Sequence, residues 1–359
     1  MSMKITFLLP KIELSGGVKV IFEYANRLYH KGHSVSVVYP FIRMRSGRRY
    51  YEYGYLSEVI KKGIASIIEG VNVDWFDLKA DLIRVPTFSE KYIPNADVIV
   101  ATWWETAFYV GRYSKKKGEK FYLIQHYEIW GGPPAIVDKS YQLGLHNIVI
   151  STWLKKVIEK LGAPVADLVL NGVNLEEFYP DKEKRDNTYI RILMPYRRLK
   201  WKGVNDGLKV YEIVKKEYAN ARLVMFGPKP GKNELPEDVE FHLLPTKDSV
   251  RKLYNSSDIF CFPSHSEGFG LPPIEAMACK LPVVSTNVGA IPDVAINGKT
   301  ALISEPKDIE SMAKNIITLI KDSKMREKIA VDGYEYVKKL TWEKAVDKME
   351  RILQRYIKK

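Results

Sequence analysis

A short apolar run, a glycine-containing turn and an amphipathic segment follow one another at the start of this chain. Residues 4–9 form a short, mostly apolar run, KITFLL. Residues 18–31 carry apolar side chains at helical spacing before Gly32, a typical helix end. A β-branched run over 34–39 comes next. This strand–helix–strand order predicts two parallel strands joined by a crossover helix.

The same alternation continues along the chain and restarts in its second half. We expect further strands at 98–101, 121–124, 147–150, 165–170, 190–194, 222–226, 239–243, 258–262 and 283–285. We expect helices at 203–218, 249–255, 272–280, 309–320 and 342–357. A chain of 359 residues is long enough for two cores. The predicted fold class is therefore α/β, with two Rossmann-like parallel-sheet lobes facing a central cleft, where such sheets bind ligands.

The boundary between the lobes is predicted from composition. The segment 180–188 is charged and nearly free of apolar residues, which is typical of a linker. We place the first lobe at 1–175 and the second at 176–340. The C-terminal helix, 341–359, is expected to pack back on the first lobe.

Charge and cysteine content limit the partners and the compartment. The net charge of +13 fits nucleic acid, an anionic membrane or phosphorylated small molecules. No nucleic-acid-binding module is recognisable, so we expect no nucleic acid. No apolar run approaches the ~20 residues of a membrane span. Without a disulfide framework around Cys261 and Cys279, we expect a cytoplasmic protein.

Arginines and aromatic residues alternate between Phe41 and Tyr55. That pattern suits an anionic membrane surface on the cytoplasmic side, or an acidic acceptor. The alternative is an ordered loop that packs on the first lobe.

Two glycines, Gly16 and Gly17, stand between the first predicted strand and its helix. Glycines let the backbone approach a ligand closely, and free amides at a helix start attract anions. A plain tight turn is the alternative. Gly227 follows a strand of the second lobe, and we expect it near a nucleotide. Trp103 and Trp104 follow a first-lobe strand and suit stacking on a sugar or lipid acceptor, although core packing is as good an explanation for one of them.

The string SEGFGLPPIEAMA places Glu267 before a helix and Glu275 inside it. Prolines at 272 and 273 fit the first helical turn, where no N–H is needed. The predicted diphosphate pocket is lined by the remaining amides, those of Gly268, Phe269, Gly270 and Leu271. Glu275 is predicted to bind a vicinal diol and Glu267 the hydroxyls of a second ring. For Glu275 alone, a favourable interaction with the helix dipole is the alternative.

The longer string SHSEGFGLPPIEAMACKLPVVSTNVGAIPDV resembles the signature of glycosyltransferase family four, the retaining GT-B nucleotide-sugar transferases. The E-x7-E pair of that family corresponds to Glu267 and Glu275. The segments SGGVKVIFEYANRLYHKGHSVSVV, LVLNGVNLEEFYP and YRRLKWKGVNDGL also resemble family segments, in the same order.

The resemblance implies a nucleoside-diphosphate-sugar donor in the second lobe and a hydroxyl acceptor, lipid-linked or not, in the first. Glu275 would bind the ribose, Glu267 the transferred sugar, and Lys202 the leaving diphosphate, with help from the amide of Gly17. No cofactor and no metal are expected, because cations of the protein stabilise the developing charge. The implied activity is retaining transfer of a hexosyl or deoxyhexosyl group in polysaccharide, glycolipid or glycan assembly.

Two positions depart from the family pattern. The family has an arginine that acts together with the lysine that corresponds to Lys202, and the string RRLKWKG offers two candidates for it. The spacing to Lys202 favours Arg197, whereas the leucine that follows favours Arg198, and both stay open. The family histidine corresponds to His126 in QHYEIWGG, a string similar to a subgroup with Q-x-x-E that includes rhamnosyl transferases. A packing histidine is the alternative.

Two other functions share this architecture. A GT-B sugar-nucleotide epimerase would isomerise its donor without an acceptor. A catalytically inactive protein would bind a nucleotide sugar and turn nothing over.

Overall fold

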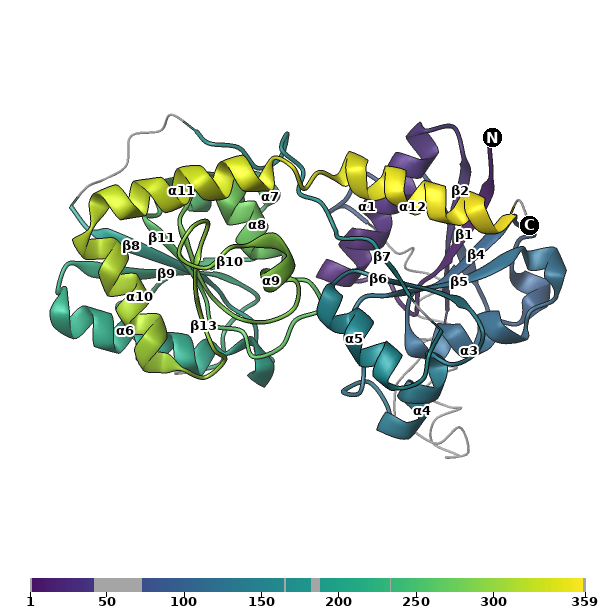
Figure 1. Cartoon of the computed structure of the whole chain (residues 1–359), viewed down its shortest axis with the longest axis horizontal. Coiled ribbons are helices and arrows are strands. Elements are labelled where there is room, and N and C mark those ends of the chain that lie inside the picture. Colours follow the sequence, from purple (N-terminus) through teal and green to yellow (C-terminus); the bar gives the residue numbers. More distant parts are fainter. Residues whose placement is uncertain (1, 42–72, 165, 182–187, 233, 358–359) are drawn as a thin grey trace. The chain divides into compact units, whose positions relative to one another are not determined.

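The computed structural model describes residues 2–41, 73–164, 166–181, 188–232 and 234–357 (Figure 1). The chain forms two compact units. Unit 1 comprises Met1–Leu170 and Trp342–Lys359, and unit 2 comprises Asn171–Thr341. Each unit is a parallel sheet with helices packed against it, so the predicted α/β class is confirmed.

The sheet of unit 1 has the strand order β3-β2-β1-β4-β5-β6-β7. Its strands are β1 (Lys4–Leu8), β2 (Ser34–Pro40), β3 (Asp81–Val85), β4 (Val98–Ala101), β5 (Glu119–Ile124), β6 (His146–Val149) and β7 (Asp167–Leu168). Its helices are α1 (Gly16–His30), α3 (Trp104–Arg112), α4 (Pro134–Ser140), α5 (Thr152–Lys160) and α12 (Trp342–Ile357). The strand order changes direction between β1 and β4, which makes this the topological switch point of the sheet. Open α/β sheets bind ligands beside the loops that follow the strands at such a point.

The sheet of unit 2 repeats this plan with the order β10-β9-β8-β11-β12-β13. Its strands are β8 (Ile190–Pro195), β9 (Ala221–Gly227), β10 (Glu240–Leu243), β11 (Ile259–Phe262), β12 (Val283–Thr286) and β13 (Leu302–Ser304). Its helices are α6 (Val204–Glu217), α7 (Lys247–Ser256), α8 (Leu271–Ala278), α9 (Ile291–Val294), α10 (Ile309–Lys321) and α11 (Ser323–Val337). The corresponding switch point lies between β8 and β11. The loops that carry Lys202 and Glu267 follow these two strands.

The chain enters unit 2 before the predicted boundary and well before the predicted linker. The amide of Val173 donates to the carbonyl of Leu340 at 2.9 Å, which fastens the incoming segment to unit 2. Asp181 is already fixed there, because Arg251 Nη1 donates to its Oδ2 at 2.7 Å and its amide donates to Asn255 Oδ1 at 2.7 Å. The segment 180–188 therefore begins inside unit 2, and residues 182–187 lie outside the described chain.

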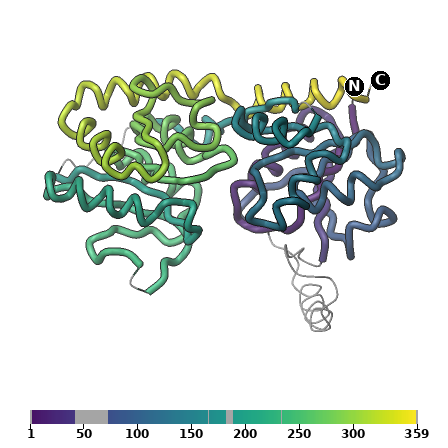
Figure 2. Tube along the Cα trace, turned by 60° about the horizontal axis from the view of Figure 1, so that its bottom comes forward, coloured from purple at the N-terminus to yellow at the C-terminus, as the bar shows by residue number. Residues whose placement is uncertain are grey.

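Helix α12 returns to unit 1 and lies along α1 (Figure 2). The indole of Trp342 is buried and meets the ring of Tyr24 edge-on, with centroids 5.5 Å apart. Around this contact, Arg27 Nε donates to Glu343 Oε1 at 3.2 Å and Lys31 Nζ donates to Asp347 Oδ1 at 2.6 Å. Apolar burial at the centre and ion pairs at the edge hold α12 in place.

The Arg-aromatic segment from Phe41 to Tyr55 lies almost wholly outside the described residues. Only Phe41 belongs to them, and the guanidinium of Arg84 lies 4.5 Å from the centre of its ring.

Candidate functional site

An ion pair lies at the carboxyl ends of β8 and β11 in unit 2. Lys202 Nζ is 2.8 Å from both carboxylate oxygens of Glu267. Ser264 Oγ also donates to Glu267 Oε1, at 2.7 Å. Glu267 is only 8% exposed, so this buried carboxylate is stabilised by a cation and a hydroxyl together. The structure thus brings two predicted site residues into direct contact.

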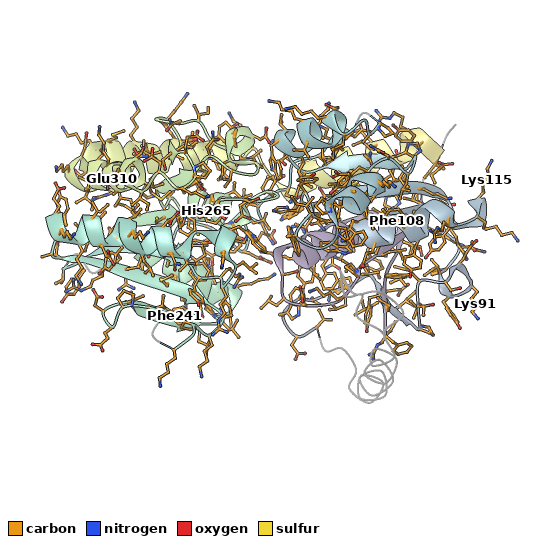
Figure 3. All side chains as sticks on the ribbon, turned by 90° about the horizontal axis from the view of Figure 1, so that it is seen from below. Lys91, Phe108, Lys115, Phe241, His265 and Glu310 are labelled. Atoms are coloured by element: carbon orange, nitrogen blue, oxygen red, sulfur yellow. The ribbon has the colours of Figure 1, made fainter. Side chains whose placement is uncertain are left out.

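The loop that carries Lys202 is fastened to the loop that carries Glu267. The carbonyl of Trp201 accepts from the amide of His265 at 2.7 Å and from Ser264 Oγ at 3.2 Å. His265 Nε2 also lies 2.6 Å from Asp206 Oδ2, at the beginning of α6. Figure 3 labels His265 in unit 2. These contacts fix the position of Lys202 relative to Glu267. Sequence reasoning did not single out His265 or Asp206.

Gly203 follows Lys202 directly and makes the closest approach between these loops. Its φ of +65° is a left-handed conformation, and an added Cβ would lie 1.9 Å from the carbonyl oxygen of Pro263. Only glycine fits such a contact without displacement. This contact explains why a glycine directly follows Lys202 in the sequence.

Arg197 and Arg198 have different charged neighbours. Arg197 is exposed, although the protein around its guanidinium lowers its pKa, and the negative charge of Glu267 opposes that shift. Arg198 instead has its Nε 3.9 Å from Glu234 Oε2, which also accepts from the hydroxyl of Tyr196. Arg197 is therefore the arginine whose guanidinium is influenced by Glu267, and Arg198 is the one that faces Glu234.

The loop before α8 leads into the N-terminus of that helix, where the sequence predicted a diphosphate pocket. Gly270 caps the helix at a φ of +93°, and Leu271 is its first residue. The first amides of a helix lack intrahelical partners and favour anions. Gly268 and Phe269 are buried, and the carbonyl of Phe269 accepts from the amide of Ala290 at 2.9 Å. The loop is therefore anchored to the segment after β12.

Glu275 lies one turn into α8 and is half-buried. The hydroxyl of Tyr254 donates to Glu275 Oε2 at 3.3 Å. Burial, and then the neighbouring carboxylate, raise the pKa of Tyr254 well above its ordinary value, so the tyrosine stays a donor. This contact helps to orient the carboxylate of Glu275.

Gly227 ends β9 and is buried. An added Cβ would lie 2.2 Å from the carbonyl oxygen of Tyr196, the residue that follows β8. The amide of Leu244, after β10, donates to the carbonyl of Gly227 at 2.8 Å. Gly227 thus joins the carboxyl ends of three neighbouring strands.

In unit 1, Gly16 and Gly17 form the first turn of α1, with Ser15 as the N-cap. Ser15 Oγ accepts from the amide of Val18 at 3.4 Å. A Cβ on Gly17 would lie 3.7 Å from the side-chain amide nitrogen of Gln125, which follows β5. The glycine turn and the β5 loop are therefore neighbours.

The two adjacent tryptophans have different environments. Trp104 is 7% exposed and packs so closely on Gly132 that a Cβ there would lie 2.6 Å from its ring. Core packing, the alternative held for one of the pair, therefore accounts for Trp104. Trp103 is half-buried, and its ring centroid lies 5.1 Å from that of Trp130. Only Trp103 keeps a face at the surface.

His126 also belongs to this aromatic group. Its ring is edge-on to Trp130, at 6.2 Å between centroids, and to Trp153, at 5.9 Å. Its Nδ1 lies 3.0 Å from the carbonyl oxygen of Tyr127. The residue is half-buried at the carboxyl end of β5.

Two buried carboxyl groups in this region were not assigned from the sequence. Burial raises the pKa of Glu128 to about 8, against hydrogen bonds from the amide of Trp104 at 2.8 Å and the hydroxyl of Tyr122 at 3.1 Å. Burial also raises the pKa of Glu105 to about 7, against a hydrogen bond from Trp103. The Q-x-x-E string was the one available signal for Glu128, and nothing in the sequence distinguished Glu105 from a surface residue.

Within the described ranges, no group of three or more His, Cys, Asp or Glu side chains has the geometry to hold a metal ion. No helix in that same part of the chain has the length and apolar character to cross a bilayer.

Comparison with known proteins gives one family and several relatives. Residues 176–336 match the family described as glycosyl transferases group 1. The capsular polysaccharide biosynthesis glycosyltransferase CapM of Staphylococcus aureus is 31% identical over 182 residues, which are 46% of this chain and 48% of CapM. The chain thus spans about half the length of the curated relatives it matches.

Two solved structures have the same fold as this chain. Sucrose-phosphate synthase from Thermosynechococcus elongatus gives a TM-score of 0.73 at 16% identity, covering 98% of both chains. HepE from Anabaena, in complex with UDP and glucose, gives 0.74 at 13% identity, covering 98% of this chain and 100% of that one. The predicted GT-B fold of two Rossmann-like sheets is confirmed.

Proposed function

Because residues 176–336 belong to the group 1 glycosyl transferases and the chain has the GT-B fold, we propose that the whole protein transfers a sugar from a nucleoside diphosphate to a hydroxyl acceptor. The observation that carries this proposal is the site around Lys202 and Glu267. Two loops of unit 2 bring a cation, a buried carboxylate and a helix N-terminus to the same end of one sheet.

The donor fits unit 2 by its chemistry. A diphosphate needs cations and free amides, which Lys202, Arg197 and the Gly270–Leu271 turn provide. A ribose diol needs an oriented acceptor, and Glu275 is one. HepE, with the same fold, was solved with UDP and glucose bound, which makes UDP the first nucleotide to test.

The Lys202–Glu267 pair leaves one donor for a diphosphate. An ammonium has three N–H groups, and Lys202 Nζ directs two of them to the carboxylate of Glu267. The Ser264 hydroxyl also donates to Glu267. A bound diphosphate competes with Glu267 for Lys202, and this competition couples recognition of the diphosphate to recognition of the sugar.

In the proposed transfer, the bond between the anomeric carbon and the diphosphate oxygen breaks, and a bond from the acceptor oxygen forms on the same face. Because the new bond forms on the face that the diphosphate leaves, the configuration at the anomeric carbon is retained. The acceptor proton passes to an oxygen of the leaving diphosphate. Lys202 and Arg197 stabilise the charge that develops on that diphosphate, which is why we expect no metal requirement. A hexose or deoxyhexose is the expected sugar.

The acceptor is assigned to unit 1, where Trp103, Trp130 and His126 lie together at the ends of β4 and β5. Aromatic faces bind the apolar faces of sugar rings. CapM, by its name, acts in capsular polysaccharide biosynthesis. A growing glycan would offer sugar rings to these aromatic side chains.

A donor screen followed by three variants tests the proposal. One of UDP-, GDP-, ADP- or dTDP-sugars should raise the melting temperature selectively, because a ligand bound only to the native form stabilises it. Lys202→Ala should slow transfer by about 10²-fold, as the loss of one charge-stabilising group does. Glu275→Ala should mainly weaken nucleotide binding. Lys200→Ala removes an exposed neighbouring cation and serves as the control.

Turnover should survive EDTA. Conversion of the donor to an isomer without acceptor would identify an epimerase instead. Full activity in both Lys202→Ala and Glu275→Ala would contradict the site.

A further inference from the structure

An exposed apolar strip follows β5 in unit 1. Its sequence from residue 129 to 136 is IWGGPPAI. Ile129 is 40% exposed, Trp130 is 53% exposed and Ile136 is 43% exposed. Large apolar side chains gathered on one short segment are typical of an interaction surface, whereas single ones are ordinary.

The strip is held firmly by the interior behind it. Trp130 packs against Trp103 at 5.1 Å, and the amide of Gly131 donates to the carbonyl of Glu128 at 2.8 Å. The hydroxyl of Tyr127 donates to Asp138 Oδ1 at 2.9 Å, which ties the segment to α4. The exposed indole is thus presented in a fixed position.

Basic residues flank the apolar side chains. Lys139 is exposed on α4, three positions after Ile136, and therefore lies on the same helical face. Lys156 is exposed on α5, three positions after Trp153, whose ring lies 5.9 Å from that of His126. The two lysines border the strip from two different helices.

This combination selects one kind of partner. An indole and branched aliphatic side chains enter the headgroup boundary of a bilayer, and lysines at its edge attract anionic lipid. The net charge of +13 favours the same surface. A protein groove would need no flanking positive charge on both sides.

We propose that Ile129, Trp130 and Ile136, with Lys139 and Lys156, form a docking strip for an anionic lipid bilayer. The strip adjoins Trp103 and His126, to which we assigned the acceptor. If the proposed function holds, docking presents that acceptor region to a lipid-linked substrate. The docking itself depends on no step of catalysis.

Vesicle sedimentation tests the strip directly. The whole protein should bind vesicles of phosphatidylcholine with about 30% phosphatidylglycerol and bind pure phosphatidylcholine at least tenfold more weakly. A variant with Ile129→Ser, Trp130→Ser and Ile136→Ser should lose at least tenfold in binding. Lys139→Ala and Lys156→Ala should each cost about fivefold, with less effect at high salt.

The matched control removes exposed apolar residues elsewhere. Ile296 and Val331 of unit 2 are 43% and 41% exposed, so Ile296→Ser with Val331→Ser should leave vesicle binding unchanged. Near-ultraviolet circular dichroism should show that both multiple variants are folded. Brominated lipid should also quench the fluorescence of the protein, and Trp130→Phe should remove most of that quenching.

The outcomes separate this inference from the proposed function. Equal binding to both vesicle types, or equal loss in the strip variant and the control, would overturn the docking strip. The rise in melting temperature caused by the donor that the screen identifies should persist in the strip variant. If no nucleotide sugar of the screen stabilises the wild-type protein while vesicle binding is intact, that result counts against the proposed function alone.

Discussion

Replacing Gly203 by alanine tests whether the loop contact positions Lys202. The Cβ would lie 1.9 Å from the carbonyl oxygen of Pro263, while real Cβ atoms essentially never approach within 3.0 Å. The two loops must therefore separate by about 1 Å. A left-handed alanine costs about 1–2 kcal/mol by itself. With the forced separation we expect a total loss of about 2–4 kcal/mol of folding stability.

Gly298 is the matched control. It is also in unit 2, its φ is +73°, and an added Cβ there would meet nothing within 4 Å. Gly298→Ala should therefore cost only the backbone contribution of about 1–2 kcal/mol. The difference between the two variants isolates the contact with Pro263.

Calorimetric melting and sugar transfer measure the two effects. Gly203→Ala should melt several degrees below Gly298→Ala, since 1 kcal/mol shifts a domain of this size by about 2–4 °C. A displacement of about 1 Å at Lys202 should also slow transfer by up to about 10²-fold. Equal melting temperatures in the two variants, or full turnover in Gly203→Ala, would refute the steric reasoning.

Two further predictions concern unit 1. The pKa of Glu128, raised by burial to about 8, means that the folded state holds a proton that the unfolded state releases above about pH 4.5. The resulting stabilisation of the folded state is complete below that pH and is lost as the pH rises to about 8. Glu128→Gln should therefore flatten the fall in melting temperature between pH 5 and 8.5, whereas Glu159→Gln, at a half-buried position, should not. Parallel curves of melting temperature against pH for the wild-type protein and both variants would contradict this reasoning. Trp342→Ala should cost about 3–5 kcal/mol in urea unfolding, because the cavity beside Tyr24 stays unfilled; an unchanged unfolding midpoint would exclude a role of this contact in holding α12.

The parallel sheets were predictable because their strands are buried on both faces. Central strands such as Val98–Ala101 are apolar at every position, and the helices between strands show clear helical periodicity. Strands β3 and β13 escaped prediction. β3 has the mixed sequence DLIRV at one edge of its sheet, and β13 has only three residues, LIS, at an edge of the other.

The candidate site was predictable where a motif fixes both residue type and place. Lys202 and Glu267 are 65 positions apart in the sequence and meet through two loops at one switch point. Sequence could not distinguish Arg197 from Arg198, because their different charged neighbours, Glu267 and Glu234, are brought near them only by folding. The roles of Trp103 and Trp104 likewise depend on Gly131 and Gly132, which lie in another loop.

The buried carboxyl groups show a different limit. Glu105 and Glu128 are of a residue type that is almost always exposed, and no local pattern marks them as interior. Glu128 contacts Tyr122 of β5 and the hydroxyl of Tyr141 just after α4, residues that are distant from one another in the sequence. Such an environment exists only after the chain has folded.

The division of unit 1 into two separate chain segments orders events during synthesis. All of unit 2 leaves the ribosome before α12 does, so it is able to fold while the surface around Tyr24 on α1 is still uncovered. That apolar surface stays exposed to solvent until α12 has been synthesised. A fragment that stops at residue 170 would leave the surface around Tyr24 uncovered permanently. Adding α12 as a separate peptide should cover that surface again.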